Sequence, residues 1–271
     1  MDALMKGASL AIGAYSAMLW RSLTGIVLMG PVWALGGGTW PATKVLRLHA
    51  LRGANSAGMA TSFFFGITYL PLAEGIAISF VAPLIALYLA AVILGETINR
   101  RAMIASLLGL VGVVVIAGAR LTGKGHAPMA GWGIIAILFS AVLYAWNLIL
   151  QRRQAQIASP SEIAFFQAVF TGLFLAMLSP WFAVWPSSAI WLHIAGSAAL
   201  AALSLWVIAW GYAREQTQVL LPLEYTAFIW AALMGWLMFD EAVTGPTVIG
   251  AVLIVIGCGI ATRKHTEQTA L

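Results

Sequence analysis

The sequence predicts an all-α polytopic membrane protein built from two five-helix repeats that are inverted relative to each other. Three observations carry this prediction: the composition, the length of the apolar runs and an internal repeat. Of the 271 residues, 62% are hydrophobic and 8% are charged, and the mean hydropathy is +0.95. A soluble globular domain carries roughly 25% charged residues. The composition therefore excludes a soluble protein and leaves no room for a soluble catalytic domain.

Apolar runs of membrane-spanning length follow one another along the chain. A spanning helix needs about 20 apolar residues, whereas a transmembrane strand has about ten residues of alternating polarity. Because the runs are longer and uniformly apolar, and because backbone groups in lipid must be satisfied within the segment, we expect helices. The nine predicted spans cover residues 14–35, 51–70, 72–94, 102–119, 129–151, 162–185, 190–212, 217–239 and 246–262.

An internal repeat relates the two halves of the chain. The segment LYLAAVILGETINRRAMIASLLGLVGVVVIAG resembles AALMGWLMFDEAVTGPTVIGAVLIVIGCGIATR, and Glu96 superposes on Glu241 at an offset of 145 residues. The same offset places the partner of the 129–151 helix at about −16 to 6. We therefore expect a parent fold of ten helices, with about nine complete in this chain and only the end of helix 1 in its first 13 residues.

The repeat predicts one membrane domain over residues 1–271. Its parts are a first repeat at 1–120 with helix 1 largely missing, a second repeat at 129–262, and a tail at 263–271. Since each repeat has an odd number of helices, the second half must insert upside down relative to the first. Inverted repeats are typical of secondary transporters that work by alternating access.

The positive charges predict the orientation. If the ancestral N-terminus is cytoplasmic, three cations fall outside (Lys6, Arg120 and Lys124) and Arg21 lies within a span. The imbalance follows the positive-inside rule and predicts a cytoplasmic C-terminus in an inner membrane. The ten cations on the cytoplasmic side are Lys44, Arg47, Arg52, Arg100, Arg101, Arg152, Arg153, Arg214, Arg263 and Lys264.

Two longer stretches carry a family resemblance. TYLPLAEGIAISFVAPLIALYLAAVILGETINRRAMIASLLGLVGVVVIAG and LLPLEYTAFIWAALMGWLMFDEAVTGPTVIGAVLIVIGCG resemble the two repeats of the EamA family of the drug/metabolite transporter superfamily, at corners that contain Pro83, Glu96, Glu224 and Glu241. The resemblance implies ten helices, a pocket built mainly from helices 1, 3, 4, 6, 8 and 9, and usually export of small metabolites such as amino acids. Similar proteins include bacterial aromatic amino acid exporters.

Other functions remain open at this point. Some relatives of the family take up nucleosides or S-adenosylmethionine, and a non-transporting membrane scaffold is a further alternative. An enzyme is disfavoured because the chain has no H-E-x-x-H or G-x-S-x-G motif and no cluster of His and Asp. The single cysteine, Cys258, allows no disulfide within one chain and no cysteine-based metal site. We expect no cofactor, no metal and no nucleic-acid partner.

Glu224 is the main candidate for a site residue. It lies about seven residues into a predicted span, roughly 10 Å deep at 1.5 Å per residue. An acid at that depth normally faces a cavity or a partner. Glu224 therefore either contacts a substrate amine or accepts a proton, or it has a structural role as a cap after Pro222 or in an ion pair with Arg21.

Aromatic and small polar side chains complete the predicted site. In spans that the resemblance assigns to the pocket, an aromatic wall could stack on a planar substrate or hold an ammonium group by cation–π contact. Each ring could equally pack against helices or lipid. The predicted substrate-binding residues besides Glu224 are Tyr225, Tyr144, Trp146, Asn147, Trp206, Trp210 and Ser79; Pro83 and Pro222 permit kinks, and Arg21, Glu96 and Glu241 are predicted structural charges.

Overall fold

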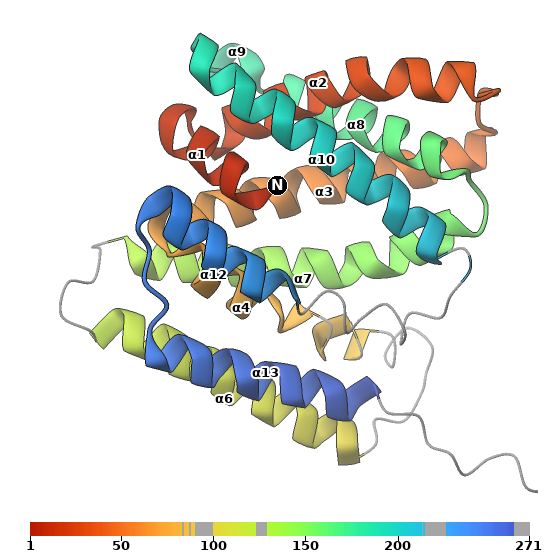
Figure 1. The fold of residues 1–271 in the computed structure, drawn as a ribbon. Coiled ribbons are helices and arrows are strands. Elements are labelled where there is room, and N and C mark those ends of the chain that lie inside the picture. The colour runs from red at the N-terminus through yellow and green to blue at the C-terminus, as the bar shows by residue number, and fades with distance from the viewer. Residues whose placement is uncertain are drawn as a thin grey trace, which may run out of the picture.

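The computed structural model describes residues 1–82, 84–86, 88–89, 100–122, 129–212, 214 and 226–262. Within these ranges the regular structure is helical throughout, which confirms the all-α prediction. The helices labelled in Figure 1 are α1 (Asp2–Ile12), α2 (Ala14–Leu35), α3 (Thr43–Tyr69), α4 (Leu72–Ser79), α6 (Arg100–Thr122), α7 (Ala130–Ala155), α8 (Pro160–Ala176), α9 (Ser179–Phe182), α10 (Ser188–Tyr212), α12 (Thr226–Phe239) and α13 (Gly245–Thr262).

Three predicted spans differ from the observed helices. In the span predicted at 72–94, α4 ends at Ser79. The span predicted at 51–70 begins eight residues earlier, since α3 starts at Thr43 and includes charged residues that the prediction placed in a loop. The span predicted at 162–185 is broken, because α8 ends at Ala176 and the four-residue α9 follows. By length and composition, α2, α7 and residues 188–211 of α10 are helices that could each cross a membrane.

Local signals fix where several helices begin and end. Gly13 has a φ of 80°, a left-handed conformation that favours glycine, and it allows α2 to start directly after α1. Ser159 caps α8, because its hydroxyl accepts a hydrogen bond from the Glu162 N–H at 3.3 Å, and Pro160 occupies the first helical position. This cap sets the position of Glu162 in the first turn of α8.

The packing of the helices is nearly symmetric under exchange of the two halves. α3 packs against α7 and α8, and α10 packs against the corresponding helices of the other half, α1 and α2. α2 packs against α8, α4 against α12, and α6 against α13, so each of these pairs joins equivalent helices. Two repeats related by a two-fold axis produce this pattern.

The pair α6 and α13 lies side by side along one edge of the bundle (Figure 1). The two helices meet at Gly112 and Gly250. A Cβ atom on either glycine would lie 2.6 Å from the backbone oxygen of the other. The absence of side chains at these two positions therefore sets how closely the helices approach.

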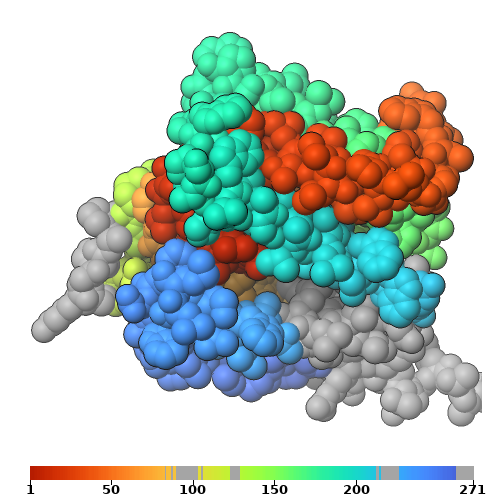
Figure 2. All heavy atoms as spheres, turned by 45° about the horizontal axis from the view of Figure 1, so that its top comes forward, coloured from red at the N-terminus to blue at the C-terminus, as the bar shows by residue number. Residues whose placement is uncertain are grey.

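α1 lies inside the bundle. It packs against α2, α3, α10 and α12, and in Figure 2 it is largely covered by other helices, with red spheres showing between α10 and α12 and beside α10. Its residues Met5, Lys6 and Ala8 are buried. The buried core of the molecule therefore forms around α1, with contributions from both halves.

Candidate functional site

A buried polar cluster joins α3 of the first half to α7 of the second half. Arg52 is only 1% exposed, and its Nε donates a hydrogen bond to Asn147 Oδ1 at 3.1 Å. Its Nη1 donates to Gln154 Oε1, and Ser56 Oγ lies 3.5 Å from Asn147 Oδ1. The Tyr144 side chain interacts electrostatically with the guanidinium. The cluster thus holds one cation among neutral polar groups.

His49 extends this cluster toward α8. It is fully buried, its ring stacks on Phe166 with centroids 5.1 Å apart, and its Nδ1 contacts Gln154 Nε2. Because Gln154 Oε1 accepts from Arg52, its Nε2 faces His49 and can only donate. His49 Nδ1 therefore accepts, and Nε2 carries the hydrogen that it donates to Glu162 Oε1 at 3.0 Å. This places a neutral imidazole between the glutamine and the carboxylate.

A second cluster holds four charged side chains around the start of α4. Lys6 Nζ forms an ion pair with Glu241 and donates to Leu70 O at 2.7 Å. The other oxygen of Glu241 accepts from the Leu72 N–H at 2.7 Å, so it caps α4. Nearby, Arg120 Nε lies 3.7 Å from Glu74 Oε2 and Thr247 Oγ1 lies 3.4 Å from Glu74 Oε1. This cluster ties α1, α4 and α6 to the α12–α13 connection.

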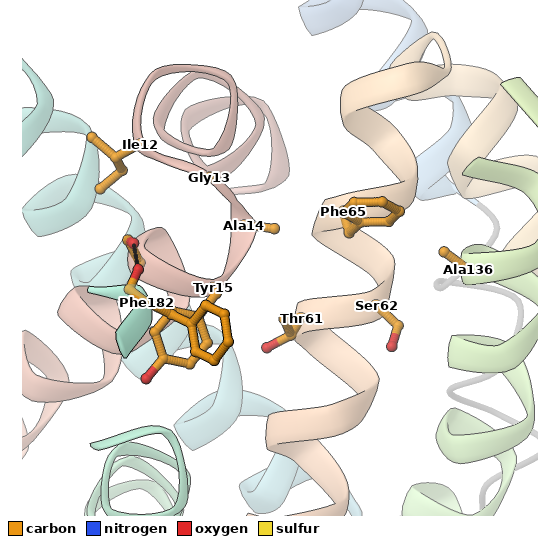
Figure 3. Close-up of a pocket in the computed structure, with 10 residues that line it drawn as sticks. Ile12, Gly13, Ala14, Tyr15, Thr61, Ser62, Phe65, Ala136 and Phe182 are labelled. Carbon is orange, nitrogen blue, oxygen red and sulfur yellow. Dashed lines mark hydrogen bonds between the residues drawn. The ribbon is translucent and has the colours of Figure 1, made fainter. Parts of the chain in front are cut away.

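A half-open groove of about 360 Å³ lies at the α1–α2 turn. Figure 3 shows Tyr15 and Phe182 on one side and Thr61, Ser62 and Phe65 of α3 on the other. The Thr61 hydroxyl is buried without a hydrogen-bond partner in the described part of the chain. None of the sequence-predicted substrate residues lines this groove.

The structure brings two of the predicted substrate residues together and leaves others apart. Asn147 and Tyr144 meet at Arg52, while Trp146 on the same helix is half-buried. The Ser79 hydroxyl donates to Ile76 O within α4 at 2.7 Å. Trp206 and Trp210 are 44% and 50% exposed on α10, and the Arg214 guanidinium lies 4.4 Å from the Trp210 ring.

Five predicted residues lie outside the described part of the chain: Pro83, Glu96, Pro222, Glu224 and Tyr225. The predicted pair of Arg21 with Glu224 is therefore not described either. Arg21 itself interacts electrostatically with Asp2, and its guanidinium lies 5.5 Å from the Phe64 ring.

Sequence reasoning missed two buried cations. The charge pattern placed Arg52 at the cytoplasmic end of the span predicted at 51–70 and Lys6 on the outer side. It did not predict their burial, and the structure shows them 1% and 3% exposed within α3 and α1. One signal in the sequence could have indicated that Arg52 lies within a helix: the residues from Thr43 to the predicted span at 51–70 contain no proline or glycine that would end a helix. No local signal pointed to their partners, which lie far away in the sequence.

Comparisons with known proteins agree with this architecture. The sequence pattern of the EamA-like transporter family matches residues 1–118 and again residues 131–263. A pseudopaline exporter of Pseudomonas aeruginosa is 23% identical over 258 residues, which cover 95% of this chain and 89% of that protein. One solved protein structure superposes with a TM-score of 0.62 at 25% identity and covers 96% of this chain and 94% of the other.

Two further relatives differ in what they transport and in which direction. An aromatic amino acid exporter of Ancylobacter novellus is 28% identical over 204 residues, covering 74% of this chain and 70% of that protein. An S-adenosylmethionine uptake transporter of Rickettsia prowazekii is 25% identical over 210 residues, covering 77% of this chain and 69% of that protein.

Proposed function

The chain belongs to the EamA-like transporter family, and on this basis we propose that it exports small metabolites, above all aromatic or amphipathic amino acids, by alternating access. That it is a multi-pass membrane transporter rests on the family and on its relatives. The substrate class and the outward direction are the proposed part. Two of the relatives named above are exporters, and one of these exports aromatic amino acids.

The polar cluster between α3 and α7 carries the proposal. Arg52 lies nine residues after Thr43, the start of α3, which is roughly 13 Å into this 27-residue helix. Polar and ionisable side chains are costly inside a membrane and mark substrate or ion pathways. In transporters built from inverted repeats, the site lies near the midplane where the repeats meet. Arg52 and Asn147 lie where the two halves meet, one in each half, toward the end of α3 that the charge pattern assigns to the cytoplasmic side.

Of the remaining predicted residues, we propose Glu224 and Tyr225, which lie outside the described part of the chain, as further substrate contacts. We propose the exposed rings of Trp206 and Trp210 on α10 as a stacking surface. Each half packs against the other through equivalent pairs of helices, and this symmetric packing supports a rocking motion of one repeat against the other. A rocking motion exposes a site between the repeats to one side of the membrane at a time.

Flux into proteoliposomes tests the function. Purified protein should move labelled L-phenylalanine or L-tryptophan faster than protein-free liposomes do, measured with and without a pH gradient. Asn147→Leu should reduce this flux, because it removes the oxygen that holds Arg52 Nε. The matched control Thr122→Val, at the exposed end of α6, should leave the flux unchanged. Absence of flux for every amino acid and nucleoside tested would favour a scaffold over a transporter.

S-adenosylmethionine uptake is the second candidate, because one relative carries that name. Labelled S-adenosylmethionine in the same liposomes distinguishes the two functions. Saturable movement of this compound, with no movement of amino acids, would replace the export proposal.

The proposed inner-membrane orientation has its own test. Cys258 is buried, so single cysteines introduced at the exposed Thr43 and Ser187 can be labelled selectively. In intact bacterial cells, an impermeant maleimide should react with Ser187→Cys and should reach Thr43→Cys only after lysis. The opposite pattern would reverse the proposed cytoplasmic placement of the C-terminus.

A further inference from the structure

We propose that Arg52 binds the carboxylate of the transported metabolite, so that the protein selects substrates that carry a carboxylate. This inference rests on the proposed transport function and names the group that the site recognises.

Arg52 lacks an acidic partner in the described residues. Its hydrogen bonds to described residues reach two amide oxygens, on Asn147 and Gln154, and these occupy two of the five N–H groups of a guanidinium. A charge removed from water needs a counter-charge or a full set of hydrogen bonds to offset the loss of hydration. Two neutral acceptors do not meet that need, whereas a bound carboxylate would.

The nearest acid in the cluster is committed elsewhere. Glu162 accepts the Nε2 hydrogen of His49, and His49 in turn accepts from Gln154. The chain of donors therefore runs from Arg52 through Gln154 and His49 to Glu162, with two neutral groups between the cation and the carboxylate. Glu162 fixes the orientation of these groups, and it does not contact the guanidinium.

The other buried or half-buried cations in the described helices each have an acid. Lys6 pairs with Glu241, Arg120 lies 3.7 Å from Glu74, and Arg21 interacts electrostatically with Asp2. This fold therefore neutralises cations within its helices when the role is structural. Arg52 is the exception among them, because its described partners, Asn147, Gln154 and Tyr144, carry no carboxylate.

The geometry suits a planar anion. Asn147 and Gln154 hold the Nε and Nη1 groups from α7, so the guanidinium is fixed before any ligand arrives. A fixed guanidinium fork matches a carboxylate in two parallel hydrogen bonds, which a lysine ammonium does not reproduce. Because Arg52 belongs to one half and its two holders to the other, the motion that opens the interface between the repeats would also expose the guanidinium.

Matched pairs of compounds test the inference on the full chain in proteoliposomes. The pairs are L-phenylalanine with phenylethylamine, L-tryptophan with tryptamine, and L-leucine with 3-methylbutylamine; each amine lacks only the carboxylate. Wild-type protein should move the acid of a pair at least about ten times faster than the amine, which is the effect of losing a charge-assisted hydrogen bond. Arg52→Gln should remove this preference, lowering the acid flux about ten-fold or more while the amine flux is retained.

Two variants control the experiment. Arg47→Gln removes an exposed cation from the same helix and should keep the wild-type preference. Arg52→Lys keeps the charge without the fork and should show a reduced preference for the acid. If Arg52→Gln fails to fold, the wild-type preference and its reduction in Arg52→Lys decide the question.

The outcomes separate this inference from the proposed function. Equal flux of acid and amine through wild-type protein would overturn the carboxylate site and leave the transporter proposal intact. Equal loss of acid and amine flux in a folded Arg52→Gln protein would also overturn it, because it would show that Arg52 only supports the fold. Absence of flux for every compound would overturn the proposed function and this inference together.

Discussion

Replacing Gly112 by alanine should destabilise the protein, whereas the same change at Gly118 on the same helix should not. At Gly112 the new Cβ would lie 2.6 Å from the backbone oxygen of Gly250, and contacts of a real Cβ are essentially never shorter than 3.0 Å. At Gly118 no atom lies within 4 Å. The helices α6 and α13 must therefore separate by several tenths of an ångström in the first variant only.

The magnitude follows from comparing the two variants. Both gain the higher helix propensity of alanine, about 1 kcal/mol, so this contribution cancels in the difference. Forcing one extra carbon into a packed contact costs about 1–3 kcal/mol. For a chain of this size each kcal/mol corresponds to a shift in melting temperature of about 2–4 °C. Gly112→Ala should therefore melt roughly 2–12 °C below Gly118→Ala.

The single cysteine provides the assay. Cys258 lies on α13, the partner of α6, and is 1% exposed. A maleimide dye that fluoresces on reaction with a thiol will report when Cys258, whose Sγ lies 3.5 Å from Phe80 O, becomes exposed as the helices around α13 separate during heating in detergent. If Gly112→Ala melts at or above the temperature of Gly118→Ala, the helices are not held together by close contact at these glycines, and the packing argument is wrong.

Three further predictions concern the charged and aromatic side chains. Lys6→Met should cost about 3–5 kcal/mol in the same melting assay because it leaves Glu241 without its cation; adding Glu241→Gln should restore part of the loss, and no restoration would mean that the pair is not coupled. Glu224→Gln should stay folded and lose transport or its pH dependence; normal transport would make this acid structural. Trp206→Ala and Trp210→Ala should each lower the flux of aromatic substrates more than that of small polar ones, by a factor that corresponds to about 0.5–2 kcal/mol of lost stacking or cation–π contact. Equal effects on both kinds of substrate would place the rings against lipid.

Much of the fold was predictable because the length of an apolar run depends only on consecutive residues. The span predicted at 14–35 has the bounds of α2, and the predicted and observed spans agree within a few residues at α7 and α13. The start of α3 was missed because Lys44, Arg47 and Arg52 follow one another closely, which is typical of a loop on the cytoplasmic side. The structure places the first two on an exposed helical turn and the third inside the bundle.

The site was harder to predict because its contacts join residues that are distant in sequence. Asn147 was selected for its place in a span assigned to the pocket, and the structure adds that it holds Arg52, 95 residues away. The capping role of Glu241 had the same difficulty, since the helix that it caps begins at Leu72, 169 residues earlier. Sequence periodicity indicates which helix carries a polar residue, and it does not indicate which helix faces it.

The symmetry of the fold bears on why the polar cluster lies where it does. Exchange of the halves maps the contact of α3 with α7 onto the contact of α10 with α1. At the offset of 145 residues, Arg52 corresponds to Ser197, a fully buried residue whose hydroxyl donates to Ile194 O at 2.9 Å and lies 3.2 Å from the Met5 sulfur. At this position the α10–α1 contact holds a hydroxyl beside a thioether, while the α3–α7 contact holds a cation oriented by amides. The backbone of the two contacts is therefore repeated, whereas the side chains at these two positions are not. The arginine is not required for packing that both contacts share, because Ser197 occupies the equivalent position. The difference at Arg52 and Ser197 is what the proposed carboxylate site at the α3–α7 contact requires.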